Sequence, residues 1–191
     1  MTGAVAGGVL GMLAGNKRAR KFVSKSAGTA LTIGGLAAVA AIGYTAWQRS
    51  RGQNVAPMQL PPADSGFPVA GTDDTLARGI LVAMIQGAKA DGHIDAQEHA
   101  RIFAQIDQFG LDADAKAFVM DELAAPLTVA RIAAYAKTPE AAAELYAATL
   151  LAMDPDTAEE RNFLTRLQGA LDLDPALAAQ IETAVRAEVN S

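Results

Sequence analysis

From residue 73 onward, apolar side chains recur at the three- and four-residue spacing of amphipathic helices. No stretch alternates apolar and polar residues at period two, so we expect no strands. The pattern predicts helices around residues 76–88, 102–109, 115–123, 129–136, 138–153, 163–171 and 174–185. Residues 73–191 are therefore predicted to form an all-α domain, one compact bundle of about seven helices.

Helix-breaking and capping residues set the ends of these helices. Gly110 is expected to end the second helix. Thr138 followed by Pro139 is typical of an N-cap and first helical position, and Asp174 with Pro175 opens the last helix in the same way. The apolar pattern and the helix-end signals thus agree with each other.

The two halves of this domain resemble each other. The apolar positions of residues 102–106 recur 61 residues later in 163–167, and those of 115–123 recur 62 residues later in 177–185. Each half reads as a helix, an acidic turn and two further helices. We therefore expect an internal two-fold pseudo-repeat, in which each half buries apolar faces that it cannot bury alone.

A second apolar region precedes the domain. Residues 27–48 contain no charge, and Tyr44 and Trp47 stand near their far end. A run of this length spans a bilayer, and aromatic residues favour its interfaces, so residues 27–48 are predicted to be a transmembrane helix. The alternative is a helix buried inside a soluble domain.

Residues 1–26 form a glycine-rich and basic segment, and the proline-rich residues 49–72 are predicted to be a flexible linker.

Small residues recur at helical spacing in the N-terminal part. The first fifteen residues are expected to form an interfacial or partly inserted helix, or alternatively a flexible glycine-rich tail. Stacked small residues allow close helix packing, so we expect the chain to associate with membrane and to form a homo-oligomer. The two stripes are Gly3, Gly7, Gly11 and Gly15, and Ala30, Gly34 and Ala38.

The charges around residues 27–48 predict an orientation. Five cations lie between Lys17 and Lys25 before the apolar run, and two, Arg49 and Arg51, follow it. Positive charge next to a membrane span stays in the cytoplasm. The chain is thus predicted to be a single-pass protein of the bacterial inner membrane with its acidic domain in the periplasm. The arginines after the run favour the alternative, a cytoplasmic domain.

Charge also restricts the kinds of partner. Residues 1–72 carry seven Lys/Arg and one acidic residue, a net +6, whereas residues 73–191 carry nine against twenty, a net −11. The acidic domain should repel a phosphate backbone, so no nucleic acid is expected as a partner. The sequence has no cysteine, residues 73–190 have no serine, and no glycine-rich phosphate loop is present. No catalytic residue is predicted, and we do not expect an enzyme.

Two acidic turns are the candidate functional residues. Asp95 with Glu98, and Asp156 with Glu159, have the spacing of capping boxes. Capping does not explain the acidic residue that precedes each pair, and three carboxylates in one turn repel each other unless a cation is present. The predicted ligands of a divalent metal cation are Asp91, Asp95, Glu98, Asp154, Asp156 and Glu159. His93 and His99, the only histidines, lie at the first turn; if either binds, a transition metal is favoured.

Residues 88–98 and 151–159, with their paired acidic motifs, resemble the TerB-like (tellurite-resistance B) superfamily. Together with the preceding basic and apolar segments, they are similar to the YebE-like inner-membrane proteins of bacteria. The resemblance implies a seven-helix bundle, metal binding at the six carboxylates above and a role in envelope or stress processes. It implies no enzymatic activity, and it gives the two histidines no role.

Two hypotheses about function follow. The first is a membrane-anchored module that binds or senses a divalent metal. The second is a scaffold without metal, whose acidic surface docks a basic partner protein and whose turns are only capped helix junctions.

Overall fold

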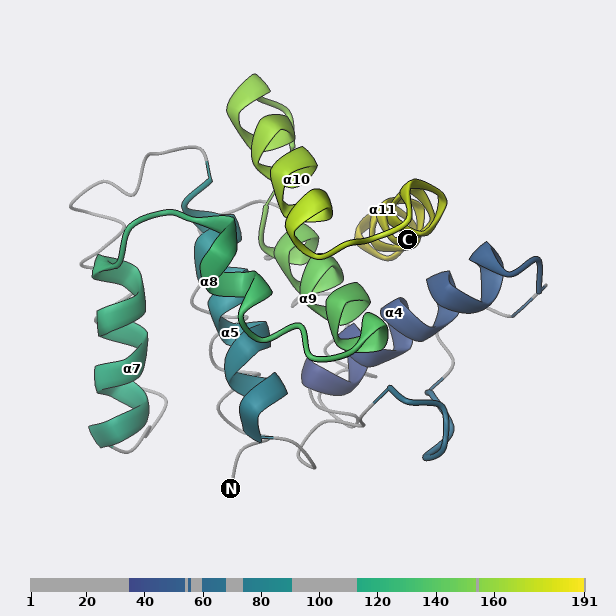
Figure 1. Cartoon of the computed structure of the whole chain (residues 1–191), viewed down its shortest axis with the longest axis horizontal. Helices are drawn as coiled ribbons and strands as arrows, with labels where there is room; N and C mark the ends of the chain where they lie inside the picture. The colour runs from purple at the N-terminus through teal and green to yellow at the C-terminus, as the bar shows by residue number, and fades with distance from the viewer. Residues whose placement is uncertain are drawn as a thin grey trace.

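A computed structural model describes residues 35–53, 55, 60–67, 74–90, 113–153 and 155–190, and all regular secondary structure in these residues is helical. Seven helices are described (Figure 1). They are α4 (Gly35–Ser50), α5 (Asp74–Ala88), α7 (Ala113–Ala124), α8 (Val129–Ala133), α9 (Pro139–Ala152), α10 (Ala158–Ala170) and α11 (Pro175–Asn190). The predicted all-α class is confirmed, and the predicted helix around residues 102–109 lies outside the described residues.

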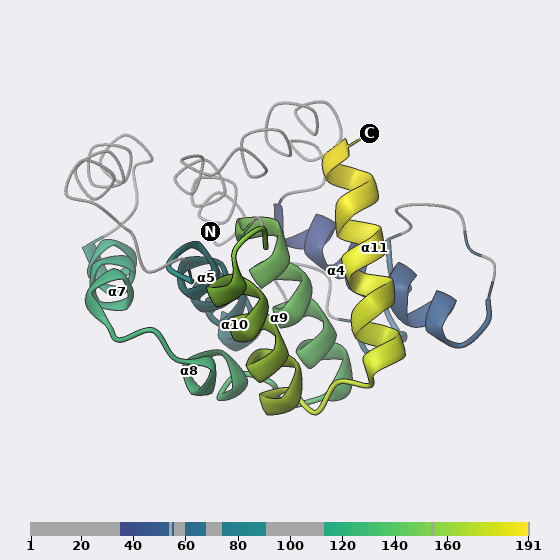
Figure 2. The same ribbon diagram turned by 90° about the horizontal axis from the view of Figure 1, so that it is seen from above.

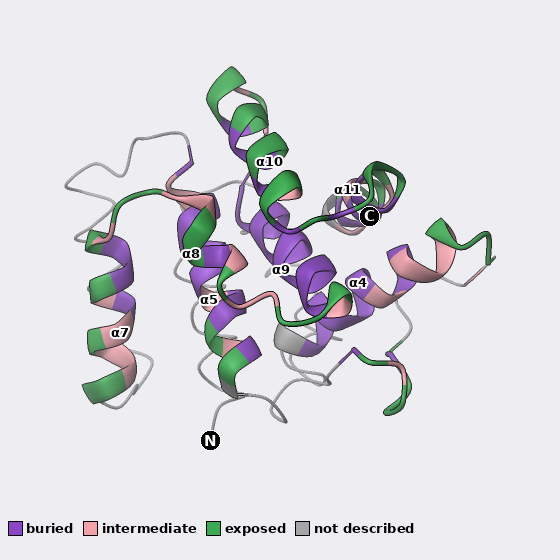
Figure 3. Cartoon of the chain, in the orientation of Figure 1, coloured by how far each residue is buried: buried purple, intermediate pink, exposed green. Residues whose placement is uncertain are grey.

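Helix α9 is the centre of the bundle. Every residue from Ala141 to Ala152 is buried, so this helix has no solvent-facing side (Figure 3). Helices α4, α5 and α11 all pack against it, and α10 lies over it in two perpendicular views (Figure 2). A helix that is apolar on all sides is stable only when neighbours cover it completely. The other elements are therefore arranged as a shell around α9.

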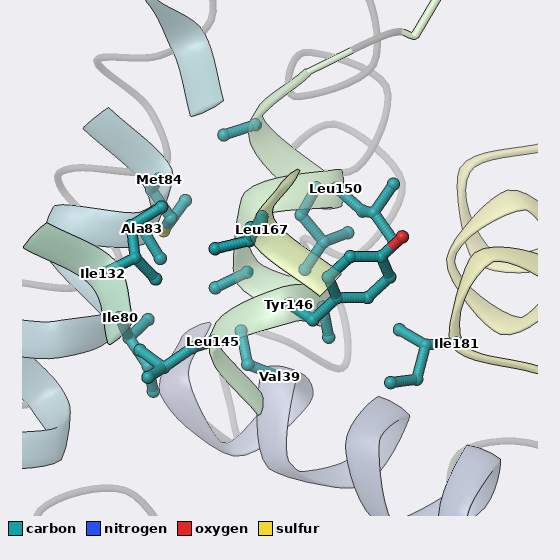
Figure 4. Packing of buried hydrophobic residues seen from close by; sticks show 14 of the residues in the cluster. Val39, Ile80, Ala83, Met84, Ile132, Leu145, Tyr146, Leu150, Leu167 and Ile181 are labelled. Carbon is teal, nitrogen blue, oxygen red and sulfur yellow. The ribbon is translucent and has the colours of Figure 1, made fainter. Parts of the chain in front are cut away.

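Side chains from several helices meet on α9 to form one core. Figure 4 shows Leu145, Tyr146 and Leu150 of α9 surrounded by residues of the other helices. Ile80 of α5 and Ile181 of α11 lie on different sides of α9 and belong to the same buried cluster. The apolar faces predicted for α5, α9, α10 and α11 are thus confirmed as core faces.

The predicted starts of α9 and α11 are confirmed. Thr138 is the N-cap of α9, its Oγ1 accepts a hydrogen bond from the backbone N–H of Ala141 at 3.1 Å, and Pro139 is the first helical residue. Asp174 precedes α11, and its Oδ1 accepts from the N–H of Ala176 at 2.8 Å. These side chains satisfy backbone donors that have no partner within the helix.

Helix α5 approaches its neighbours closely at two glycines. A Cβ atom at Gly87 would lie 2.8 Å from the carbonyl oxygen of Thr149 on α9. At Gly79 it would lie 2.6 Å from the Cβ of Tyr135, directly after α8. Only a residue without a side chain fits at such separations, so these glycines fix how closely α5 packs.

Helix α4 corrects the prediction of a transmembrane segment. Its residues Ala38, Val39, Ile42 and Ala46 are buried in the same core as α9, and α4 packs against both α9 and α11. Within the described ranges, no helix is long and apolar enough to cross a membrane. The predicted single-pass inner-membrane placement with a periplasmic domain is therefore wrong. The small residues of α4 allow close packing against other helices. The absence of charge in this segment did not by itself distinguish such packing from insertion into lipid.

The aromatic residues near the end of α4 have a different role from the one predicted. Tyr44 and Trp47, expected at a membrane interface, contact the ring of Phe67 edge-on at centroid distances of 5.6 and 5.8 Å. Phe67 is buried and ends a described stretch, residues 60–67, which we call the strap. The strap belongs to the proline-rich residues predicted to be a flexible linker, and its last residue is anchored in the bundle.

Two further predictions are only partly covered by the described residues. Ala38, from one small-residue stripe, is buried in the core, whereas Ala30, Gly34 and the four N-terminal glycines lie outside the described residues. Self-association through these stripes stays a prediction. In the predicted pseudo-repeat, α5 and α7 correspond to α9 and α11, but the middle helix of the first half is not among the described elements. The repeat therefore also stays a prediction.

The contact between Gly87 and Thr149 can be tested by adding one methyl group. Gly87→Ala is expected to lower the free energy of unfolding by about 1–3 kcal/mol, because the new methyl collides with backbone that cannot move independently. The measurement is urea unfolding followed by circular dichroism. Gly169→Ala is the matched control, since a Cβ there meets nothing within 4 Å, and this exposed helical site should gain up to about 1 kcal/mol. Equal effects at both glycines would contradict the close packing of α5.

Candidate functional site

The structure describes only two of the six predicted metal ligands. Asp91, Asp95 and Glu98 of the first acidic turn lie outside the described residues, together with both histidines, and so does Asp154 of the second turn. Asp156 and Glu159 are described, and both are exposed at the start of α10. Whether the six carboxylates come together thus remains a prediction.

The capping box of the second turn is one residue later than predicted. Thr157 is the N-cap of α10, and its Oγ1 accepts a hydrogen bond from the backbone N–H of Glu160 at 3.2 Å. In return, Oε2 of Glu160 accepts from the backbone N–H of Thr157 at 3.0 Å and from its hydroxyl at 2.8 Å. The Asp156–Glu159 box is therefore wrong. The Thr157 hydroxyl both accepts and donates, which a carboxylate at the N-cap cannot do.

This register leaves two carboxylates uncommitted. In the part of the chain that the structure describes, the side chains of Asp156 and Glu159 make no hydrogen bond or ion pair; only the backbone carbonyl of Asp156 is used, accepting from Nη1 of Arg161 at 2.7 Å. Over the same residues, no group of three or more metal-ligating side chains is gathered. The turn therefore offers two exposed carboxylate oxygen donors of the kind that hard cations prefer.

A buried polar cluster joins α5, α7 and α8. Glu122 on α7 is buried, and its carboxylate accepts two hydrogen bonds from the Arg131 guanidinium, at 2.9 Å on Oε1 and 2.6 Å on Oε2. Gln86 on α5 donates to Oε1 of Glu122 at 2.7 Å and accepts from the backbone N–H of Thr128 at 2.9 Å. Glu122 is thus a buried charge whose oxygens are paired, which is the condition under which such a charge is tolerated.

The electrostatics of Glu122 follow from these partners. Burial alone raises the pKa of this carboxyl, but the hydrogen bonds from Arg131 and Gln86, with the charges of Arg131 and Lys89, lower it below its ordinary value.

Lys89 lies at the end of α5, and its Nζ donates to the backbone carbonyls of Leu123 at 2.9 Å and of Ala125. Burial lowers the pKa of Lys89. This lysine therefore caps the C-terminus of α7, where a cation is favoured.

Glu144 on α9 has the opposite environment. It is 1% exposed, and its Oε1 has no hydrogen-bond partner in the described structure. Burial raises the pKa of Glu144 to about 8, so this carboxyl is neutral at pH 7. Two residues later, the hydroxyl of Tyr146 donates to Oε1 of Glu182 on α11 at 3.0 Å. Glu144 is thus a buried titratable group with no compensating charge among the described residues.

The buried acidic residues were not among the predicted functional residues, although the sequence carries a signal for each. Glu122 follows Val119 by three positions and so lies on the apolar face predicted for α7. Glu144 interrupts a run of alanines and leucines that is apolar on every side, so no solvent-facing position is left for it. The partners of Glu122 had no such signal, because Gln86 and Arg131 lie on other helices, α5 and α8.

The pairing of Glu122 with Arg131 predicts a large effect of a single substitution. Arg131→Met is expected to lower the free energy of unfolding at pH 7 by about 2–4 kcal/mol, because it leaves a buried carboxylate without its main partner. Since the pKa of Glu122 is below its ordinary value of 4.5, the wild-type chain loses this stabilisation only as the pH falls through that region. Urea unfolding at pH 7 measures the effect of the substitution. Urea unfolding of the wild-type chain below pH 4.5 measures the loss of stability when Glu122 is protonated.

Arg166→Met is the matched control for Arg131→Met. Arg166 is exposed on α10, so the same substitution there should change the free energy of unfolding by less than about 0.5 kcal/mol. The double variant Glu122→Met, Arg131→Met should recover part of the loss, since it no longer buries an unpaired charge. Similar losses for Arg131→Met and Arg166→Met would show that the ion pair does not hold the three helices together.

Comparison with known proteins places the chain in a family. Residues 1–185 match the family described as "Protein of unknown function (DUF533)", a description that is compatible with the TerB-like resemblance without naming it. The chain is also similar to the "Uncharacterized protein in ampR 5'region" of Yersinia enterocolitica, with 28% identity over 126 residues, 66% of this chain and 90% of that protein. No solved structure gives a significant match. Because the family match spans nearly the whole sequence, the chain belongs to the DUF533 family.

Proposed function

We propose that the protein is a helical metal-binding or sensing module of the TerB-like, and more narrowly YebE-like, kind. The proposal is supported most by the register of the capping box, in which Thr157 and Glu160 complete the start of α10. Asp156 and Glu159 are therefore exposed and not needed for capping. Neither carboxylate caps the helix, although the charge of Glu159 in the first turn favours the N-terminus of α10, and both are oxygen donors suited to a divalent cation.

The proposed site combines the two turns. The residues that would hold the cation are Asp91, Asp95, Glu98, Asp154, Asp156 and Glu159. A bound divalent cation supplies positive charge that offsets the repulsion among these carboxylates. The chemistry is binding alone, and no reaction is proposed.

The alternative proposal is a docking surface for a basic partner protein. It is supported by the −11 net charge of residues 73–191 and by the exposure of Asp156 and Glu159. It also agrees with the finding that, among the described residues, no three metal-ligating side chains are gathered. On this proposal the two carboxylates attract cationic side chains rather than a metal ion.

Thermal unfolding of the full chain with added calcium, manganese or zinc separates the two proposals. A cation present at about 100 times its dissociation constant should stabilise the fold by ~2.7 kcal/mol, which corresponds to a rise in Tm of roughly 5–10 °C. Asp156→Asn with Glu159→Gln is expected to weaken this rise. Asp121→Asn, which removes an exposed carboxylate on α7, should leave it unchanged.

The titration decides against metal binding if none of the three cations raises Tm in the wild-type chain. The docking proposal is then the one left. An equal rise in wild type and in the Asp156→Asn, Glu159→Gln variant would instead place the bound cation away from the second turn.

A further inference from the structure

The seam between α4 and α9 contains a buried carboxyl at its centre. A Cβ atom built at Gly43 of α4 would lie 3.3 Å from Cγ of Glu144 and 3.6 Å from its backbone nitrogen. The backbone of α4 thus lies directly against this side chain, without room for water between them. Oε1 of Glu144 is buried and has no partner among the described residues, so nothing there is built to receive a negative charge.

The strap closes this seam. Cε1 of Phe67 lies 3.3 Å from the same Cβ position at Gly43, so the phenyl ring, α4 and Glu144 meet at one point. One turn earlier on α9, Gly66 of the strap lies against Glu140, with 3.3 Å between its Cβ position and Cδ of Glu140. Gly66 has φ +80°, a conformation that favours glycine. The strap therefore covers two successive turns of α9 on the face that α4 approaches.

No described charged group compensates Glu144. The titratable and charged groups on the elements around it, and directly after two of them, are Tyr44 and Arg49 on α4 with Arg51 after it, Asp64 on the strap, Glu140 and Tyr146 on α9, Glu182, Arg186 and Glu188 on α11, and Asp74 and Arg78 on α5 with Lys89 after it. Several of these already interact elsewhere: Arg51 stacks over Trp47, and Arg78 stacks over Phe118. Burial raises the pKa of Glu188, and the charge of Arg49 offsets part of that rise. Over the described residues, burial is the cause of the raised pKa of Glu144.

We propose that the α4–α9 seam is a pH-sensitive latch: when Glu144 loses its proton, the strap and the C-terminal half of α4 separate from α9 and the carboxylate reaches water. The strap is the part expected to move, because the fit of Phe67 and Gly66 depends on the positions of Gly43, Glu140 and Glu144. Helix α5 stays in place, since at Gly87 it packs directly against the backbone of Thr149 on α9.

The direction of the effect follows from linkage. The pKa of Glu144 is about 8 in the closed seam, against an ordinary value of 4.5 when the group is in water. The closed seam therefore holds a proton that the open seam releases, and its stability relative to the open state falls as the pH rises between these two values and levels off above the higher one. The latch is thus closed most stably at low pH, and it opens as the pH rises towards about 8. It does not depend on the acidic turns or on a metal.

The single tryptophan of the chain reports on the latch, because Trp47 contacts Phe67 edge-on. As the pH of the full chain is raised from about 6 to about 9.5, we expect the emission of Trp47 to shift to longer wavelength and its quenching by acrylamide to increase at least about two-fold. The change should be half complete at a pH no higher than about 8, with far-ultraviolet circular dichroism unchanged.

Three variants complete the experiment. Glu144→Gln has nearly the same shape but does not titrate, so it should abolish the transition; Glu144→Leu should do the same and serves as a second variant without a titrating group. Asp121→Asn, which removes an exposed carboxylate on α7 outside the seam, should retain it. The proposal is overturned if the wild-type emission does not change, if both Glu144 variants keep the transition, or if circular dichroism is lost together with the emission change.

Discussion

The complete burial of α9 is the constraint on which the rest of the structure depends. Residues 141–152 have no exposed position, so covering this helix requires neighbours on every side. Helices α4, α5 and α11 pack against it directly, and α4 supplies one side although it lies far from the other helices in the sequence. The hydrophobic effect thus favours the burial of the apolar helix α4 in the core.

Because the core is buried, each polar group in it has a large effect on the stability of the fold. Glu122 keeps its charge because Arg131 and Gln86 together complete the bonding of its carboxylate. Glu144 has no such partner and is accommodated by remaining neutral. The two residues show both ways in which a helical bundle accommodates a buried acid: one is a fixed link between three helices, and the other is a group whose protonation state is coupled to packing.

The functional proposals concern a different part of the molecule from the core. At the second acidic turn, the Thr157 hydroxyl and the Glu160 carboxylate form the capping box of α10. Asp156 and Glu159 are not part of this cap. A side chain that folding does not require is available for binding. The buried seam at Glu144 lies against α4 and the strap instead, so the proposed cation binding and the proposed response to pH involve separate parts of the chain.

The sequence by itself determined the local structure, because helix periodicity and caps such as Thr138 and Asp174 depend only on neighbouring residues. Only the tertiary structure decided where α4 lies, since twenty-two uncharged residues suit a lipid bilayer and a protein core equally well. The capping register at Thr157 was likewise ambiguous, because adjacent acidic residues offer two boxes. The partners of Glu122 and the isolation of Glu144 depend on how residues of different helices pack together, and local pattern does not contain that information.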